Sequence, residues 1–404
     1  MLALQAMTPA DLVREVPEVS LAEARKIVAA VHRGDPVAAG AAVRRSAAHA
    51  VKAAGELPAL TMLAETASAI DPFVKYLLAG PDGARFEAVR IPLEHPGRVT
   101  VCVSSQVGCA LACAFCATGR LGLTRNLAAW EIVEQVRVVR ARLPAPARVP
   151  ASETLAAGRF RSSLRGGPES IGPARVPARG TLAARKFRSS LRGGPESIGP
   201  ARVHGVVFQG MGEPLANLDA VLQAIRVFSE PCALGIDARA ITVCTAGLPG
   251  GIRRLAAEAP RVRLGISIAS AIADRRRAIM PIAQRHDLDD VIAAAAEHAR
   301  ATGLSPMWAV TLLDGVNDAD ADARALADRA LAFHAATGIR PRLSLLDYNP
   351  IGDGDPFVRS PRMAAFRAVL SAAGLASHRR YSGGSDVAAA CGQLASQLSG
   401  TGAV

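Results

Sequence analysis

Hydrophobic and β-branched residues recur in short runs, separated by longer amphipathic stretches, along most of the chain. Apolar positions spaced three or four apart predict helices, as at 128–143 and 217–229. The short runs predict strands at 98–105, 203–209, 240–246, 262–268, 307–313 and 342–348. Strands that alternate with helices in this order are typical of a parallel α/β sheet or an open barrel, in which the chemistry gathers where strands end.

The alternation occupies the middle of the chain and predicts a core over residues 81–375. Before it, residues 1–80 predict a small helical domain in which Ser20 is the N-cap of a helix that ends near a glycine. After it, residues 376–404 predict a C-terminal segment, with a short strand and a glycine-containing loop that leads to Cys391.

A tandem repeat interrupts the core. Residues 146–172 and 173–199 are nearly identical copies with a period of 27 residues, rich in Gly, Pro, Ser and Arg. Solenoids need about three or more units, each with an apolar face to bury. We therefore interpret 146–203 as a disordered insertion rather than as a folded or RNA-binding module.

The charge of the chain lies mainly in this insertion. The 404 residues carry a formal charge of +12, and 146–203 holds eleven Lys or Arg and three Glu, a net +8. The overall charge is therefore weak evidence for a nucleic-acid partner, since a flexible arginine-rich arm is usually only solvated. No apolar run reaches eighteen residues and the N-terminus lacks a secretion signal, so we expect a cytoplasmic protein without a membrane.

Cysteines supply the candidate chemistry. Cys109, Cys113 and Cys116 form a CxxxCxxC set, and Cys102 stands seven residues upstream of it. Three thiolates on one loop favour an iron–sulfur cluster with one open iron, because a zinc site would need a fourth Cys or His nearby. Zinc and coincidence are the alternatives, and Cys232, which belongs to no motif, is expected to be a structural or surface thiol.

Several ordered motifs carry a family resemblance. The cysteine loop "GCALACAFCATGRLGLTRNL" resembles the cluster loop of radical S-adenosylmethionine (SAM) enzymes, and specifically of the RlmN/Cfr-type adenosine methyltransferases. The resemblance continues in "VVFQGMGEPLANL", "LLDGVNDADA", "LLDYNP" and "DVAAACGQLA", and it covers roughly residues 70–395 apart from the insertion.

The resemblance implies a fold, an activity and cofactors. The fold would be a partial (β/α)6 barrel, and the reaction would add a methyl group to carbon 2 of an adenosine in 23S rRNA, and also in tRNA. Such a carbon is a poor nucleophile, so the cofactors supply the difficult chemistry. They would be a [4Fe-4S] cluster and two SAM molecules per turnover, with an electron donor such as flavodoxin. We expect a monomer.

Three residues match the catalytic positions of this family. Cys391 matches the cysteine that carries the methyl group, and Cys102 matches the cysteine that releases the product by forming a disulfide. Glu87 matches the proton acceptor. Without the resemblance, Cys391 would be read as a small buried hydrophobe and Glu87 as a solvated strand carboxylate.

Further residues match the SAM pocket of the family, with departures. Cys244 stands where the family has Ser, and Ala269 where it has His. Losing one hydrogen bond to SAM would weaken binding by about 0.5–1.5 kcal/mol. The remaining matches to the pocket are Gly212, Glu213, Ser267, Ile268 and Asn317. Outside this pocket, in the run before Cys391, Gly383 stands at the place of an arginine of the family, a departure that bears on the RNA target.

Other functions stay open at this point. Within the enzymes, the alternatives are a carbon-8 methyltransferase or a divergent paralogue with another RNA substrate. From a different class, the chain could be an iron–sulfur RNA-binding protein that has lost SAM turnover. The presence of Cys102, Glu87 and Cys391 together argues against this last reading, because a binding protein needs none of them.

Overall fold

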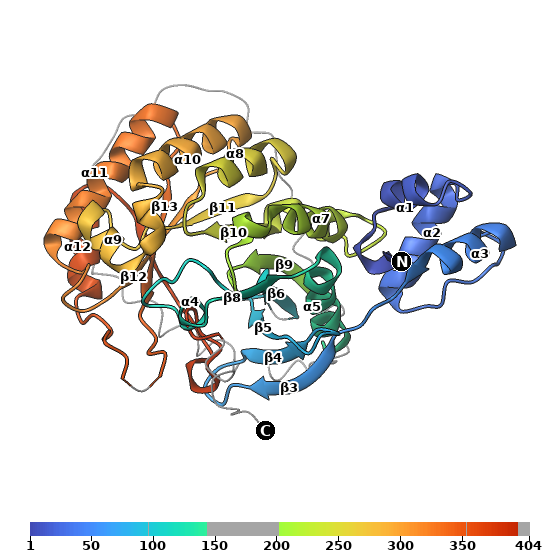
Figure 1. Ribbon diagram of the computed structural model, residues 1–404. Helices are drawn as coiled ribbons and strands as arrows, with labels where there is room; N and C mark the ends of the chain where they lie inside the picture. The colour runs from blue at the N-terminus through green and yellow to red at the C-terminus, as the bar shows by residue number, and fades with distance from the viewer. Residues whose placement is uncertain (96, 144–201, 353, 395–404) are drawn as a thin grey trace, which may run out of the picture.

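A computed structural model describes residues 1–95, 97–143, 202–352 and 354–394. Its main feature is a ten-stranded sheet with the order β14-β13-β12-β11-β10-β9-β6-β5-β4-β3 (Figure 1). The neighbours from β6 to β14 are parallel, and they are β6 (Arg98–Val103), β9 (Arg202–Phe208), β10 (Ile241–Thr245), β11 (Arg263–Ser267), β12 (Met307–Leu312), β13 (Arg342–Asp347) and β14 (Ser377–Arg380). All six predicted strands are confirmed, and β14 and β3 are the edges of an open sheet in the described residues.

Helices follow the parallel strands and lie along the outside of the curved sheet (Figure 1). They are α5 (Ala129–Ala141), α7 (Leu218–Ser229), α8 (Pro249–Glu258), α10 (Leu288–Thr302), α11 (Asp320–Thr337) and α12 (Met363–Ala372). The helices predicted at 128–143 and 217–229 are thus confirmed. Between sheet and helices lies one large apolar core, in which Trp308 of β12 contacts Phe333 of α11 edge to face.

Short elements connect these main ones. They are α4 (Ala117–Arg120), α9 (Ala273–Ile279), the hairpin of β7 (Gln106–Gly108) and β8 (Leu123–Asn126), and the 3-10 turns Pro214–Asn217, Ala238–Ala240, Pro281–Gln284 and Ser385–Val387. The parallel strands all direct their carboxyl ends toward the side of the sheet where this hairpin and the C-terminal loop lie (Figure 1).

The N-terminal helices form a separate small core beside α5 and α7 (Figure 1). They are α1 (Pro9–Glu15), α2 (Leu21–Arg33) and α3 (Arg45–Ala54), preceded by Leu4–Ala6 and framed by β1 (Leu2–Ala3) and β2 (Gly55–Glu56). Ser20 caps α2 as predicted, because its hydroxyl accepts from the Glu23 amide while the Glu23 carboxylate accepts from the Ser20 amide. Gly34 ends the helix in a left-handed conformation.

Both predicted boundaries of the core need correction. The helical part ends at Ala54, and β3 (Thr61–Ala67) and β4 (Val74–Ala79) join the main sheet antiparallel, next to β5 (Arg85–Pro92). Strand β3 escaped prediction because it is a half-exposed edge strand of mostly small or polar residues, with few β-branched side chains. At the other end, β14 pairs with β13, so the core extends past residue 375.

The predicted insertion lies outside the described residues, apart from Arg202 and Val203, which begin β9. Within the described chain, none of the helices combines the length and hydropathy that a membrane crossing requires.

Candidate active site

One cavity lies at the carboxyl ends of the parallel strands, where the α/β pattern predicted the chemistry. It brings together residues from the cysteine loop, from the ends of β9 to β13 and from the C-terminal segment. The predicted site residues that line it are Cys109, Cys113, Cys116, Gly212, Glu213, Cys244, Ser267, Ala269 and Cys391. We call it the first cavity.

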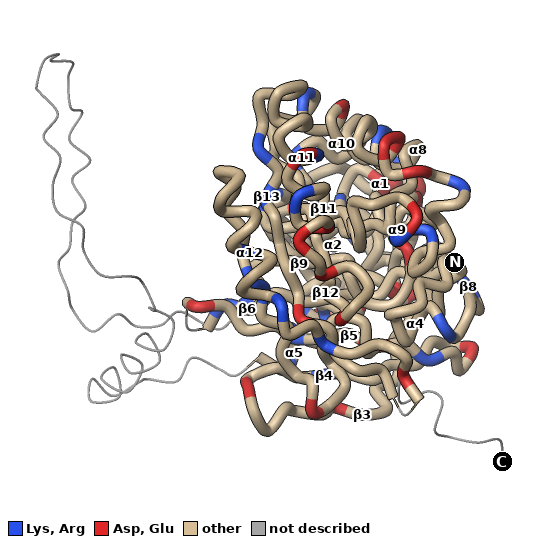
Figure 2. Tube along the Cα trace, turned by 90° about the vertical axis from the view of Figure 1, so that its left-hand side faces the viewer, with Lys and Arg blue, Asp and Glu red and all other residues tan. Residues whose placement is uncertain are grey.

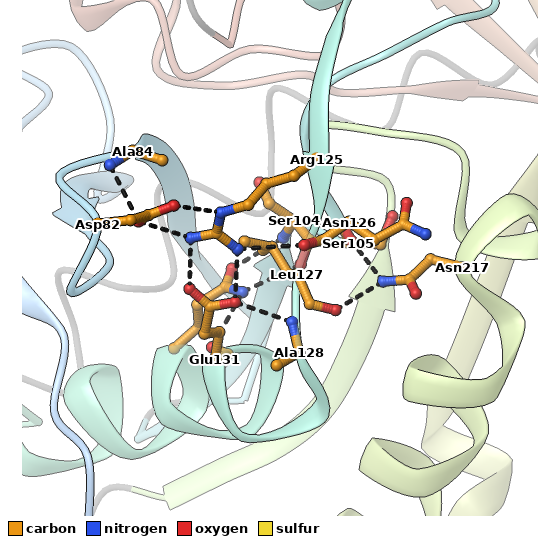
Figure 3. A network of polar contacts seen from close by, with 11 residues as sticks. Asp82, Ala84, Ser104, Ser105, Arg125, Asn126, Leu127, Ala128, Glu131 and Asn217 are labelled. Atoms are coloured by element: carbon orange, nitrogen blue, oxygen red, sulfur yellow. Dashed lines mark hydrogen bonds and ion pairs between the residues drawn. The ribbon is translucent and has the colours of Figure 1, made fainter.

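The cysteine loop joins the two strands of the β7–β8 hairpin, and a polar network fixes this hairpin (Figure 3). Arg125 forms ion pairs with Asp82 and with Glu131, with nitrogen–oxygen distances of 2.5 and 2.8 Å. The Asn217 amide donates to the carbonyls of Ser105 and Leu127, at 2.8 Å each. These contacts hold both ends of the hairpin, so the loop between them starts and ends at fixed positions.

The three thiols of the loop lie in an environment of low polarity. Burial raises the pKa of Cys109 to about 11. Burial also raises the pKa of Cys113, and the neighbouring thiols of Cys116 and Cys109 raise it further. Iron would offset this effect, because a bound cation favours the thiolate form of its ligands.

The donor set therefore fits an iron–sulfur cluster in chemistry. Three thiols that influence one another line one cavity. The Glu213 carboxylate lines the same cavity, but its oxygens accept hydrogen bonds from the amides of Leu215 and Ala246. As placed, no group of three Cys, His, Asp or Glu in the described chain is already arranged around a metal position.

The segment after β9 contributes backbone to the first cavity. Gly212 has a φ of 98°, and a Cβ there would lie 2.5 Å from the Gln106 Cβ, so only glycine fits. The buried Glu213 carboxylate accepts from the amides of Leu215 and Ala246, at 3.0 and 2.8 Å. Glu213 thereby joins the ends of β9 and β10, and its burial raises its pKa.

Two predicted pocket residues lie outside the first cavity. Ile268 is fully buried in the main core. The Asn317 side chain is also buried, donating to the carbonyl of Ala269 at 2.6 Å and accepting from the amide of Leu313 at 2.7 Å. Asn317 therefore shapes the backbone around Ala269, while its polar atoms are directed to protein groups.

Sequence reasoning missed Arg276 of α9, which supports the same strand ends. The buried guanidinium donates to the carbonyls of Ser267 and Ala246, at 2.7 and 2.6 Å, and also to that of Ile268. Burial lowers its pKa to about 10. Arginine is common on exposed helix faces, so the pattern gave no signal that this one turns inward.

A second cavity adjoins the first, and Cys391 lines both. Its other walls include Cys102 of β6, Arg380 at the end of β14, and Tyr381. All seven cysteines are free thiols in this structure, so the expected disulfide between Cys102 and Cys391 is absent. Burial, followed by the proximity of the Cys391 thiol, raises the pKa of Cys102.

The backbone of Cys391 is held by two side chains. The Cys391 amide donates to the Ser382 hydroxyl at 2.7 Å, and the Asn349 amide donates to the Cys391 carbonyl at 3.3 Å. Asn349 belongs to the "LLDYNP" motif, which was recognised in the sequence without a role for this residue.

Glu87 lies outside the lining of both cavities. It is fully buried on β5, and its carboxylate pairs with the buried ammonium of Lys75 at 3.1 Å. Lys75 also donates to the carbonyl of Ala388 at 3.4 Å, so this ion pair lies beneath the loop that carries Cys391. Without the family resemblance the sequence predicts a solvated strand carboxylate here, and the burial of Glu87 contradicts that interpretation. Its predicted role as proton acceptor stays a prediction.

No protein-family model matches the chain. The fold is that of a radical SAM methyltransferase. The crystal structure of such an enzyme from Sphaerobacter thermophilus matches with a TM-score of 0.73 and 31% identity, covering 98% of this chain and 100% of that one.

Curated relatives define the family within this class. A probable RNA methyltransferase of Sorangium cellulosum (strain So ce56) is 54% identical, over 93% of this chain and 88% of its own length. The dual-specificity RNA methyltransferase RlmN of Syntrophobacter fumaroxidans is 36% identical, over 85% of this chain and 82% of its own length. The chain belongs to the RlmN-type family of radical SAM methyltransferases.

Proposed function

We propose that this protein methylates carbon 2 of an adenosine in 23S rRNA, and also in tRNA, and that Cys391 carries the methyl group. The observation that supports this most is the position of Cys391 on the wall of both cavities. The Cys391 side chain can thus react in the first cavity, beside the cysteine loop, and also in the second cavity, beside Cys102.

The first cavity would hold the cofactors. Cys109, Cys113 and Cys116 would bind a [4Fe-4S] cluster, and the backbone around Gly212 and Ser267 would border SAM. Cluster and SAM together supply a methyl group and a carbon radical when bound. Cys244 offers a thiol in place of a hydroxyl at this wall, with its sulfur 3.7 Å from the Gln209 amide oxygen.

The residues of the chain then have distinct tasks. The Cys391 sulfur accepts a methyl group and presents its carbon to the base. With the cofactors bound, this methyl group would lose one hydrogen before its carbon joins the base. The Cys102 thiolate then attacks the Cys391 sulfur, the electron pair of the broken sulfur–carbon bond goes to the carbon, and this carbon takes up a proton to become the new methyl group as the disulfide forms.

The resemblance gives Glu87 the task of taking the proton from carbon 2, and because its carboxylate is buried against Lys75 beneath the Cys391 loop, this task requires that loop to move. Lys75 would hold the Glu87 carboxylate in place between turnovers.

The reaction sets further requirements. It consumes two SAM molecules per methylated adenosine and needs an electron donor such as flavodoxin. We propose that the protein acts as a monomer in the cytoplasm.

Anaerobic reconstitution with iron and sulfide, followed by SAM, a reductant and rRNA, tests the proposal. We expect 2-methyladenosine and 5′-deoxyadenosine in equal amounts, with chromatography separating the carbon-2 and carbon-8 isomers. Cys232→Ala is the matched control, because this thiol lies in neither cavity. Absence of 5′-deoxyadenosine would leave only an RNA-binding role. An 8-methyl product would show that the methyl group is added to carbon 8 rather than to carbon 2.

A further inference from the structure

Tyr381 differs from the other aromatic residues of the described chain. Its side chain is 67% exposed, and it is the only aromatic among the large hydrophobic residues that the described surface exposes. It also lines the second cavity, together with Cys102 and Cys391. A large ring that lines a cavity and is still mostly exposed can contact a ligand there.

The ring is fixed in place despite its exposure. Its hydroxyl donates to the Asp71 carboxylate at 2.7 Å, and its ring forms a T-shaped contact with the buried Phe73 ring, at a centroid distance of 6.1 Å and an angle of 73°. Asp71 also accepts from the Gly384 amide at 2.8 Å. A ring anchored at its polar end and by this ring contact leaves a face available for stacking, with little entropy left to lose.

The neighbouring residue adds a positive charge without a partner. The half-buried Arg380 guanidinium donates to the neutral amide oxygen of Gln209 at 2.8 Å, and no described carboxylate lies within ion-pair distance of it. Elsewhere on the described surface, basic and acidic residues alternate, and many are paired (Figure 2). The second cavity is therefore lined by an aromatic ring and by a cation that no described carboxylate neutralises.

We propose that Tyr381 is the base-stacking residue of this enzyme, and that it receives an unpaired base of the RNA substrate while Arg380 faces a phosphate of the same strand. This inference rests on the proposed function and names the residues that hold its substrate. Aromatic stacking tolerates any base, because every base has a π-face, and it suits a nucleotide turned out of its helix. The Cys391 sulfur and this nucleotide would then share one cavity.

The test uses the full-length protein and a short single-stranded RNA that carries the fluorescent base 2-aminopurine. Tyr381→Leu removes the ring and keeps an apolar side chain, and Tyr381→Phe keeps the ring without its hydroxyl. Leu331→Ala, an exposed leucine on α11 outside both cavities, is the control. Methylation of Cys391 without RNA is measured in parallel, since that step needs no stacking.

We expect Tyr381→Leu to weaken RNA binding roughly 5- to 150-fold and to abolish quenching of the bound fluorophore. Tyr381→Phe and Leu331→Ala should stay within about twofold of the parent, and Cys391 methylation should be unchanged in all three. In Arg380→Gln, the salt dependence of binding should lose about 0.7 from its logarithmic slope.

Two results would overturn the inference. Unchanged binding and quenching in Tyr381→Leu would show that the base lies elsewhere, and equal losses in the Leu and Phe variants would assign the effect to the Asp71 contact rather than to stacking. If the parent methylates Cys391 but binds no RNA, the proposed RNA substrate itself fails. The parallel methylation assay keeps these failures apart.

Discussion

The two cavities are built in different ways. The first takes most of its wall from short motifs at the ends of consecutive strands, supported by local contacts such as that between Glu213 and Ala246. The second is lined mainly by two segments far apart in the sequence, within 73–102 and 380–394. The hydrogen bond between Asp71 and Gly384, which joins positions 313 apart, connects the same two parts of the chain. The first cavity thus depends mainly on local motifs, whereas the second depends on packing between segments far apart in the sequence.

Removing a cysteine of the cysteine loop should have the largest effect on activity, because the cluster in the first cavity is needed for every later step of the proposed reaction. Cys113→Ala is expected to lose its cluster and to cleave no SAM above background. Iron content and 5′-deoxyadenosine release measure this, with Cys232→Ala as control. A variant that keeps its iron and its SAM cleavage would show that the cluster is held elsewhere.

Removing Cys102 should separate the two cavities in function. Cys102→Ala is expected to keep its iron–sulfur absorbance and to methylate Cys391, yet to stop as a covalent adduct between protein and RNA. Denaturing electrophoresis with labelled rRNA would detect the adduct. A bleached cluster in this variant would mean that Cys102 is a ligand and that the division between the cavities is wrong.

A methyl group at Gly383 should disturb only the second cavity. An added Cβ would lie 2.5 Å from the Phe73 ring and 2.6 Å from the Asp71 carboxylate, both well below contact distance. Gly383→Ala should therefore lower the free energy of unfolding by about 1–3 kcal/mol through overpacking. Unchanged iron content would confirm that the first cavity is spared.

Gly250→Ala is the matched control for this substitution. Its Cβ meets nothing within 4 Å, and the residue lies in α8, so stability should stay the same or rise by about 0.5–1 kcal/mol. Equal destabilisation of both variants would show that the effect comes from the backbone rather than from the contacts of residue 383 with Phe73 and Asp71.

The smallest effect on the free energy of unfolding is expected when the charge of Asp71 is removed. Partial burial acts to raise its pKa, but hydrogen bonds from Tyr381, Gly384 and Phe73 outweigh it, so the pKa lies below the usual 3.8. A carboxylate with a lowered pKa stabilises the fold at pH values above 3.8 and loses this contribution as the pH falls through the lowered value.

Denaturant unfolding of the parent and of Asp71→Asn measures this contribution. We expect a difference of about 1 kcal/mol that is constant from neutral pH to about pH 4 and shrinks at lower pH. A difference that grows as the pH falls would reverse the sign and contradict the contacts assigned to Asp71.

The sequence predicted the first cavity far better than the second. Strand periodicity and the spacing of Cys109, Cys113 and Cys116 are local signals, and they identified both the strand ends and the loop. Strand β3 could not be predicted because it has few β-branched residues. The burial of Arg276 could not be predicted because tertiary packing decides which way its side chain turns. The contacts of Asp71 and Lys75 with the C-terminal loop link residues more than 300 positions apart, which no short-range pattern can reveal.

The central claim is that one side chain, Cys391, serves both cavities. Peptide mass spectrometry after anaerobic incubation with SAM labelled in its methyl group tests it most directly. Without RNA, the account predicts the labelled methyl on Cys391, and after one turnover with RNA it predicts an unmethylated Cys391 linked to Cys102. A label on Cys244 or Cys102, or a disulfide that omits Cys391, would contradict it.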